Sequence, residues 1–213
     1  MRCDDLATAG AFLVHSPIRW DAAWQRPQEI FSRLARTCDV LYVETPVFLD
    51  DVVRPALDRS EPIPGVHRVV PRLPAMYAAL GHATQVVVRT LLLELLGNDK
   101  ECRARFESPV QWYCTPEPAA VMLGAFDERA VVYDRLTDEE PMADATPASD
   151  TVALNSAPYG AEDAERWTGE RLLLEHADIV FNTGRMLSAK TQSYWERIAS
   201  EVLRLTRLPF RRV

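Results

Sequence analysis

Short runs of apolar residues alternate along this chain with longer segments that have the pattern of helices. Within the short runs the apolar residues are nearly continuous, as is typical of strands buried on both faces of a parallel sheet. The predicted strands are 11–15, 40–44, 66–70, 110–114, 130–134 and 179–182, and the predicted helices are 27–37, 77–96, 117–126, 161–176 and 185–205. This alternation predicts an α/β fold, with one doubly wound, mostly parallel, Rossmann-like sheet of about six or seven strands.

Chain length and composition favour one globular domain and argue against nucleic-acid binding. The sequence has 213 residues, 47% of them hydrophobic, which is ample for one sizeable core and short for two. Its formal net charge is -7 at pH 7, whereas a nucleic-acid-binding face is normally basic. We therefore expect a single domain over 1–195, a helical tail over 196–213, and no nucleic-acid partner.

The cysteines and the N-terminus bear on metal binding and location. The four cysteines show no C-x-x-C spacing and no histidine at ligand spacing, so they predict no zinc site and no disulfide framework. The apolar run near the N-terminus is too short for a signal peptide. We expect a cytoplasmic protein. Of the four cysteines, Cys3, Cys38, Cys102 and Cys114, we expect Cys38 and Cys114 to be small buried thiols, because they lie at predicted strand boundaries.

The most apolar stretch, residues 85–96, allows two interpretations. It is shorter than the ~20 apolar residues that a membrane-spanning helix needs, and Arg89 and Glu94 interrupt it. The first interpretation is a helix buried between the sheet and its neighbours. The second is a helix at the inner face of the membrane, where nearby arginines contact anionic head groups and a lipid-linked acceptor is within reach. These arginines are Arg68, Arg72, Arg89, Arg103 and Arg105.

A long loop rich in aromatic and charged residues follows the first predicted strand. Residues 15–28 place two tryptophans, two arginines and an aspartate where a connection of roughly 2–6 residues is usual. Ligands of doubly wound sheets bind outside the carboxyl ends of the strands, which is the place of this loop. The sequence therefore predicts a ligand site here.

Five residues of this loop have a candidate role in binding or catalysis. Arg19 and Arg26 carry planar, permanent charges that suit phosphate or carboxylate groups. Trp20 and Trp24 offer apolar faces to a sugar ring, and Asp21 can accept from sugar hydroxyls or act as a base.

The same residues also have structural alternatives. Trp24 could pack in the core, and Asp21 could cap the following helix. Arg26 could pair with Glu29 or Glu44. Function is the preferred interpretation for the loop as a whole and, among single residues, for Arg19 and Asp21.

A second candidate site lies at the end of the predicted strand over 130–134. The segment after it, 136–160, is acidic and poor in large apolar residues. We expect that segment to be a mobile loop. Asp138 and Glu139 lie in it, and acids in such a loop are more often solvated than metal-bound, so no metal is expected. His15 is a candidate donor to a substrate oxygen, or a histidine satisfied by backbone. The residues expected along one edge of the sheet, in a shared cleft, are His15, Arg19, Asp21 and Asp134.

Four motifs occur in the same order as in one family of enzymes. They are R-W-D-x-x-x-Q-R-P-Q at 19–28, P-V-Q-W-Y-C-T-P at 109–116, A-V-V-Y-D at 130–134 with D-E at 138–139, and A-D-I-V-F-N-T-G-R at 177–185. With them, residues 10–190 resemble the N-terminal, acceptor-side domain of bacterial GT-B glycosyltransferases of the family 4 type, in the branch of teichuronic acid biosynthesis.

The resemblance implies one half of a GT-B fold and the transfer of a sugar from a nucleotide-sugar donor to a glycan or lipid-linked acceptor, without a cofactor. The second half of such an enzyme has no counterpart in the sequence. We therefore expect the chain to act with a separate donor domain or partner, or to be part of a longer protein, and to be inactive alone. For this activity the candidate catalytic residues are His15, Arg19 and Asp21, and the candidate substrate-binding residues are Trp20, Trp24, Gln25, Arg26, Thr115, Asp134, Asp138 and Glu139.

Two other functions stay open at the level of the sequence. The first is a non-catalytic descendant of that domain, which keeps a cleft for carbohydrate or protein. The second is a different nucleotide-binding α/β protein, although no glycine-rich phosphate loop follows the first strand. Hydrolase chemistry has little support, since the sequence has no G-x-S-x-G motif.

Overall fold

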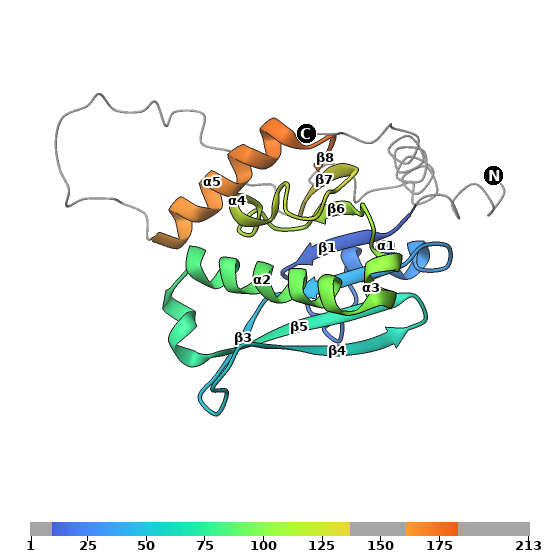
Figure 1. The fold of residues 1–213 in the computed structure, drawn as a ribbon. Coiled ribbons are helices and arrows are strands. Elements are labelled where there is room, and N and C mark those ends of the chain that lie inside the picture. The colour runs from blue at the N-terminus through green and yellow to red at the C-terminus, as the bar shows by residue number, and fades with distance from the viewer. Residues whose placement is uncertain (1–9, 137–160, 183–213) are drawn as a thin grey trace, which may run out of the picture.

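The computed structural model describes residues 10–136 and 161–182, and the strands in these ranges form one sheet (Figure 1). The sheet order is β3-β5-β2-β1-β6-β7-β8, with all pairings on this path parallel, and β4 lies antiparallel beside β5. The prediction of an α/β, Rossmann-like, mostly parallel sheet is confirmed. The strands are β1 Phe12–Ser16, β2 Val40–Glu44, β3 Val47–Leu49, β4 Ala56–Ile63, β5 Val66–Pro74, β6 Val110–Tyr113, β7 Ala130–Arg135 and β8 Ile179–Asn182.

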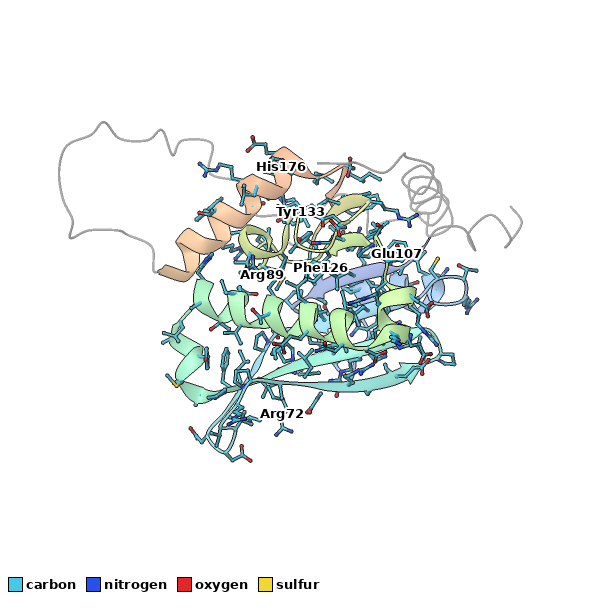
Figure 2. All side chains as sticks on the ribbon, in the orientation of Figure 1. Arg72, Arg89, Glu107, Phe126, Tyr133 and His176 are labelled. Carbon is cyan, nitrogen blue, oxygen red and sulfur yellow. The ribbon has the colours of Figure 1, made fainter. Side chains whose placement is uncertain are left out.

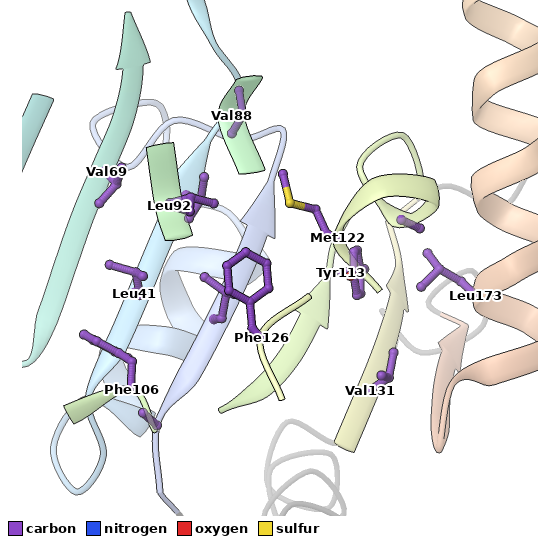
Figure 3. Close-up of a cluster of buried hydrophobic side chains, with 14 of the residues drawn as sticks. Leu41, Val69, Val88, Leu92, Phe106, Tyr113, Met122, Phe126, Val131 and Leu173 are labelled. Carbon is purple, nitrogen blue, oxygen red and sulfur yellow. The ribbon is translucent and has the colours of Figure 1, made fainter. Parts of the chain in front are cut away.

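Helices cover both faces of the sheet, and each face has its own apolar cluster. On one face, α1 packs Ile30 and Phe31 against an aromatic group that includes Phe12 and Trp112. On the other face, α2, α3, α4 and α5 pack over residues such as Leu41 and Tyr113 (Figure 3). The helices are α1 Arg26–Leu34, a 3-10 helix at Ala75–Ala79, α2 His82–Asn98, α3 Lys100–Arg105, α4 Ala119–Met122 and α5 Ala161–His176.

The structure departs from the predicted elements mainly on the β3–β5 side of the sheet. β4 was not predicted, because most of its residues are exposed and polar and it shows no apolar run. The single helix predicted over 77–96 is two helices, separated at Gly81, whose backbone has a φ of 38°. The helix α3 was also missed, and the Asp99 side chain caps it by accepting from the backbone of Glu101 and Cys102.

The apolar segment 85–96 lies within α2 and packs on the sheet through Val88 and Leu92. None of the helices in the described ranges is both long enough and apolar enough to cross a membrane. Two of the arginines expected to contact anionic head groups instead bond to other groups of the protein. Figure 2 labels Arg89 and Arg72 among the side chains. Arg89 donates to the Val121 carbonyl at 3.3 Å, and Arg72 contacts Asp58 at 3.3 Å. Contact with a membrane surface therefore stays a prediction.

Several predicted segments fall outside the described residues. These are the acidic loop after Leu136, the helix over 185–205 and the tail over 196–213, together with Asp138, Glu139 and Cys3.

Candidate functional site

A cavity of about 310 Å³ lies at the carboxyl ends of β1, β2 and β6, where doubly wound sheets bind ligands. The other sides of the cavity come from α2 and from the segment between β6 and α4. Its polar lining consists of His15, Ser16, Glu44, Thr45, Gln85, Thr115 and Glu117. Its apolar lining consists of Pro17, Val43, Pro46, Val88, Pro118 and Met122.

His15, at the cavity end of β1, is a buried and uncharged imidazole. Only 3% of its surface is exposed, and its ring stacks on Tyr113 with centroids 4.7 Å apart. Burial removes water from the charged form and lowers the pKa of His15 from 6.5 to about 4. The imidazole is therefore neutral at physiological pH.

Gln111 fixes which nitrogen of His15 carries the proton. The Gln111 amide nitrogen donates to the Met122 carbonyl at 3.1 Å, so its oxygen is the atom left for Tyr113 and His15. His15 Nε2 is buried and bonds to no described residue, which assigns the contact with Gln111 to Nδ1. Because the amide oxygen can only accept, Nδ1 holds the proton and Nε2 offers a lone pair.

Glu44, at the end of β2, organises the long loop after β1. Its side chain is fully buried and accepts two hydrogen bonds from Arg68, at 2.6 and 3.1 Å. It also accepts from the Trp20 backbone N–H at 2.8 Å and from Arg19 at 3.3 Å. Arg68 extends this network to Asp21 at 3.3 Å. One carboxylate therefore holds the first half of the loop against the sheet.

Arg26 and Asp134 form an ion pair that joins the start of α1 to the end of β7. The Arg26 Nη2 and Asp134 Oδ1 atoms are 2.7 Å apart, and the Asp134 side chain is fully buried. Burial raises the pKa of Asp134 from 3.8 to about 6, although Arg26 opposes this shift. This pairing replaces the pairing of Arg26 with Glu29 or Glu44 that the sequence suggested.

Many polar groups of the R-W-D-x-x-x-Q-R-P-Q motif form hydrogen bonds within the protein itself. Gln28 donates to the Arg19 carbonyl at 3.0 Å and accepts from the Gln25 backbone at 3.1 Å. Gln25 is the N-cap of α1, the role that the sequence suggested for Asp21. Trp20 is buried, whereas Trp24 is 60% exposed instead of lying in the core.

The predicted site residues are therefore divided among three places. His15 and Thr115 line the cavity. Arg19 and Asp21 lie on the adjoining loop, where 41% and 66% of their side-chain surfaces are exposed. Asp134 is held by Arg26 and is not among the described residues that line the cavity.

Three residues of this region were missed from the sequence. Glu44 and Glu117 follow the same rule that selected His15, since each lies at or just after the end of a parallel strand. Gln111 is a polar residue in an otherwise apolar strand run, which is a usable signal. Within 10–136 and 161–182, no group of three His, Cys, Asp or Glu side chains is placed to hold a metal ion.

The shifted pKa of His15 predicts a pH dependence of stability. Between pH 4 and 6.5 the unfolded state binds more protons than the folded state at this residue, so its contribution to the free energy of unfolding rises with pH. His15→Gln should make this rise shallower in urea unfolding measured across that range.

Asp134→Asn provides a control of opposite sign. The folded pKa of Asp134 is raised to about 6, so its contribution falls as pH rises from 3.8 to about 6. Removing it should make the overall rise steeper. An unchanged pH slope in the His15→Gln variant would contradict the assignment of a buried, neutral imidazole.

Comparison with known proteins gives a distant structural similarity. No protein-family model and no curated protein matches the sequence. The fold is similar over part of its length to a GT-B glycosyltransferase structure described as "Trehalose-6-phosphate from E. coli bound with UDP-2-fluoro glucose", with a TM-score of 0.42 and 11% sequence identity. The similarity covers 59% of this chain and 32% of that one. The chain thus spans about a third of the length of the structure it matches.

Proposed function

We propose that this chain is the acceptor-side domain of a glycosyltransferase, which moves a sugar from a nucleotide-sugar donor to a glycan or lipid-linked acceptor. The observation that carries the proposal is the lone pair of His15 Nε2, buried at the cavity without a partner among the described residues. The ordered motifs of the sequence support the same function. A donor domain, separate from the described residues, would supply the rest of the nucleotide-sugar site.

In this proposal an acceptor hydroxyl enters the cavity and donates to His15 Nε2. As the hydroxyl oxygen bonds to the anomeric carbon, its proton passes to Nε2, and the bond to the nucleotide diphosphate breaks with its electron pair on the leaving group. A pKa of about 4 makes His15 a weak base. Its larger contribution is therefore to orient the hydroxyl, and proton transfer follows once the new bond makes that hydroxyl acidic.

The adjoining loop supplies the charged groups of the proposed site. Arg19 is partly exposed and permanently charged, and it suits the diphosphate as negative charge develops there. Asp21 is more exposed and is held by Arg68, so it suits sugar hydroxyls as an acceptor. Glu44 bonds directly to Arg19, and Arg68 links Glu44 to Asp21, which supports a shared role for these two loop residues.

The test is transfer of radiolabelled sugar from a panel of sugar nucleotides, by the chain alone and after addition of a donor domain encoded beside it. We expect no transfer by the chain alone. In the active pair, His15→Gln should lower turnover by about 100-fold, the lower range for loss of a proton-transfer group. His67→Gln is the matched control, because His67 lies away from the cavity and contacts Asp39 and Arg105.

The remaining outcomes separate the hypotheses. Rapid turnover by the chain alone would contradict the need for a donor domain. Absence of turnover with every pairing, together with retained saccharide binding, would favour the non-catalytic carbohydrate-binding protein.

A further inference from the structure

We infer that the cavity beside His15 accepts an uncharged, hydroxyl-rich sugar residue and rejects one that carries a phosphate or carboxylate. This inference rests on the proposed function and specifies the acceptor. It follows from the charges and hydrogen-bonding groups that the described residues bring together at the ends of β1, β2 and β6.

Two of the polar groups at the cavity, His15 Nε2 and the Glu117 carboxylate, accept hydrogen bonds and cannot donate them. Glu44 adds no further acceptor, because its fully buried carboxylate is already occupied by Arg68, Arg19 and the Trp20 N–H. The Thr45 hydroxyl and the Gln85 amide can donate or accept, whereas the Ser16 hydroxyl already bonds to Ile18 and Tyr42, and the Thr115 hydroxyl donates to Glu117. Among the described lining residues there is no lysine or arginine. The lining therefore matches a ligand that donates hydrogen bonds.

The two carboxylates differ in how their charges are balanced. Glu44 is neutralised from outside the cavity lining by Arg68 and Arg19. Glu117 accepts a hydrogen bond from Thr115, and no described cation forms an ion pair with it. Its negative charge is the one that a ligand in this cavity meets.

These charges decide between neutral and anionic sugars. Each sugar hydroxyl can donate to a carboxylate or to His15 Nε2, and hydrogen bonds to an ionised acceptor are the stronger kind. A phosphate would place its charge beside Glu117 without a compensating cation, in a site that is partly shielded from water. Apolar groups from Pro17, Val88 and Met122 suit the carbon face of a neutral ring.

The experiment follows the His15 imidazole by NMR in protein labelled at histidine. Glucose, galactose, mannose and N-acetylglucosamine are titrated separately, each against its own 6-phosphate. At least one neutral sugar should shift the His15 signals, with an affinity at least about tenfold tighter than that of its phosphate, a difference of about 1.4 kcal/mol.

Variants and salt test the cause of this selectivity. Glu117→Gln should reduce the ratio of the two affinities, for the neutral sugar and for its phosphate, by at least about fivefold. The substitution removes the unbalanced charge and keeps an oxygen that accepts hydrogen bonds. Glu94→Gln makes the same change in net charge on the exposed side of α2 and should leave this affinity ratio unchanged. If Glu117→Gln fails to fold, added salt must strengthen binding of the phosphate to the unaltered protein, since screening reduces repulsion.

Three results would overturn the inference, and they differ in what they leave standing. If the phosphorylated sugar shifts His15 at equal or lower concentration, the preference is wrong while the sugar site of the proposed function stands. If neither Glu117→Gln nor salt changes the ratio of the affinities for neutral and phosphorylated sugar, the charge of Glu117 is not the cause of a preference for neutral sugars. If no sugar of either kind shifts His15, the cavity is not an acceptor site, and the proposed function loses its supporting observation.

Discussion

Replacing Glu44 with alanine is expected to lower the free energy of unfolding by about 3–5 kcal/mol, the range for removing one partner of a buried ion pair. The carboxylate is fully buried and accepts from two arginines and one backbone N–H. Without it, Arg68 loses two hydrogen bonds, and the backbone N–H of Trp20 is left buried without its acceptor. Urea unfolding at pH 7 measures the loss directly.

The matched control is Glu29→Ala on the outer side of α1. Glu29 also bonds to an arginine, Arg33, at 3.0 Å, but both side chains are largely exposed. Pairs of this kind contribute about 0.5 kcal/mol or less. Glu44→Gln should fall between the two, since its amide oxygen still accepts from one donor. Equal losses at positions 29 and 44 would contradict the organising role of Glu44.

The elements that the sequence predicted correctly are those whose burial is visible as a run of apolar residues in their own sequence. β2 lies between two other strands and under helices on both faces, so its five residues are all buried, and its apolar run marked the same bounds. By contrast, β4 pairs only with β5 and is largely exposed. Only Leu57 and Ile63 of this strand pack against the core, so no regular apolar pattern marks it, and local sequence therefore could not locate it.

The site was predictable in position and less so in its contacts. The rule of strand ends selected His15, and the family motif at 109–116 contained Thr115; both residues line the cavity. The contact of Glu44 with Arg68 depends on β5 lying beside β2, a pairing of residues 24 positions apart. The protonated nitrogen of His15 depends likewise on Gln111 in the neighbouring strand. Such contacts arise from sheet order, which a single sequence read locally does not specify.

The same dependence on a distant neighbour reverses the expected sign of a common stabilising mutation at Gly169 in α5. Alanine in place of glycine within a helix normally stabilises by about 1 kcal/mol. A Cβ atom on Gly169, however, would lie 2.0 Å from the backbone oxygen of Pro116. That oxygen cannot rotate away as a flexible side chain can, so α5 or the segment after β6 must move. We expect Gly169→Ala to lower the free energy of unfolding by about 3 kcal/mol, at the upper end for overpacking.

Gly97→Ala is the matched control because Gly97 also lies in a helix, α2, but has open space. Its added Cβ would come no closer than 4.0 Å to the end of the Arg103 side chain, so this variant should be about 0.5–1 kcal/mol more stable than the original protein. Urea unfolding of the two variants should therefore give changes of opposite sign. A stabilised Gly169→Ala variant would contradict the close approach of α5 to Pro116. If the approach is real, the displaced segment includes Thr115 and Glu117, and the variant should also weaken sugar binding at the cavity in the folded protein.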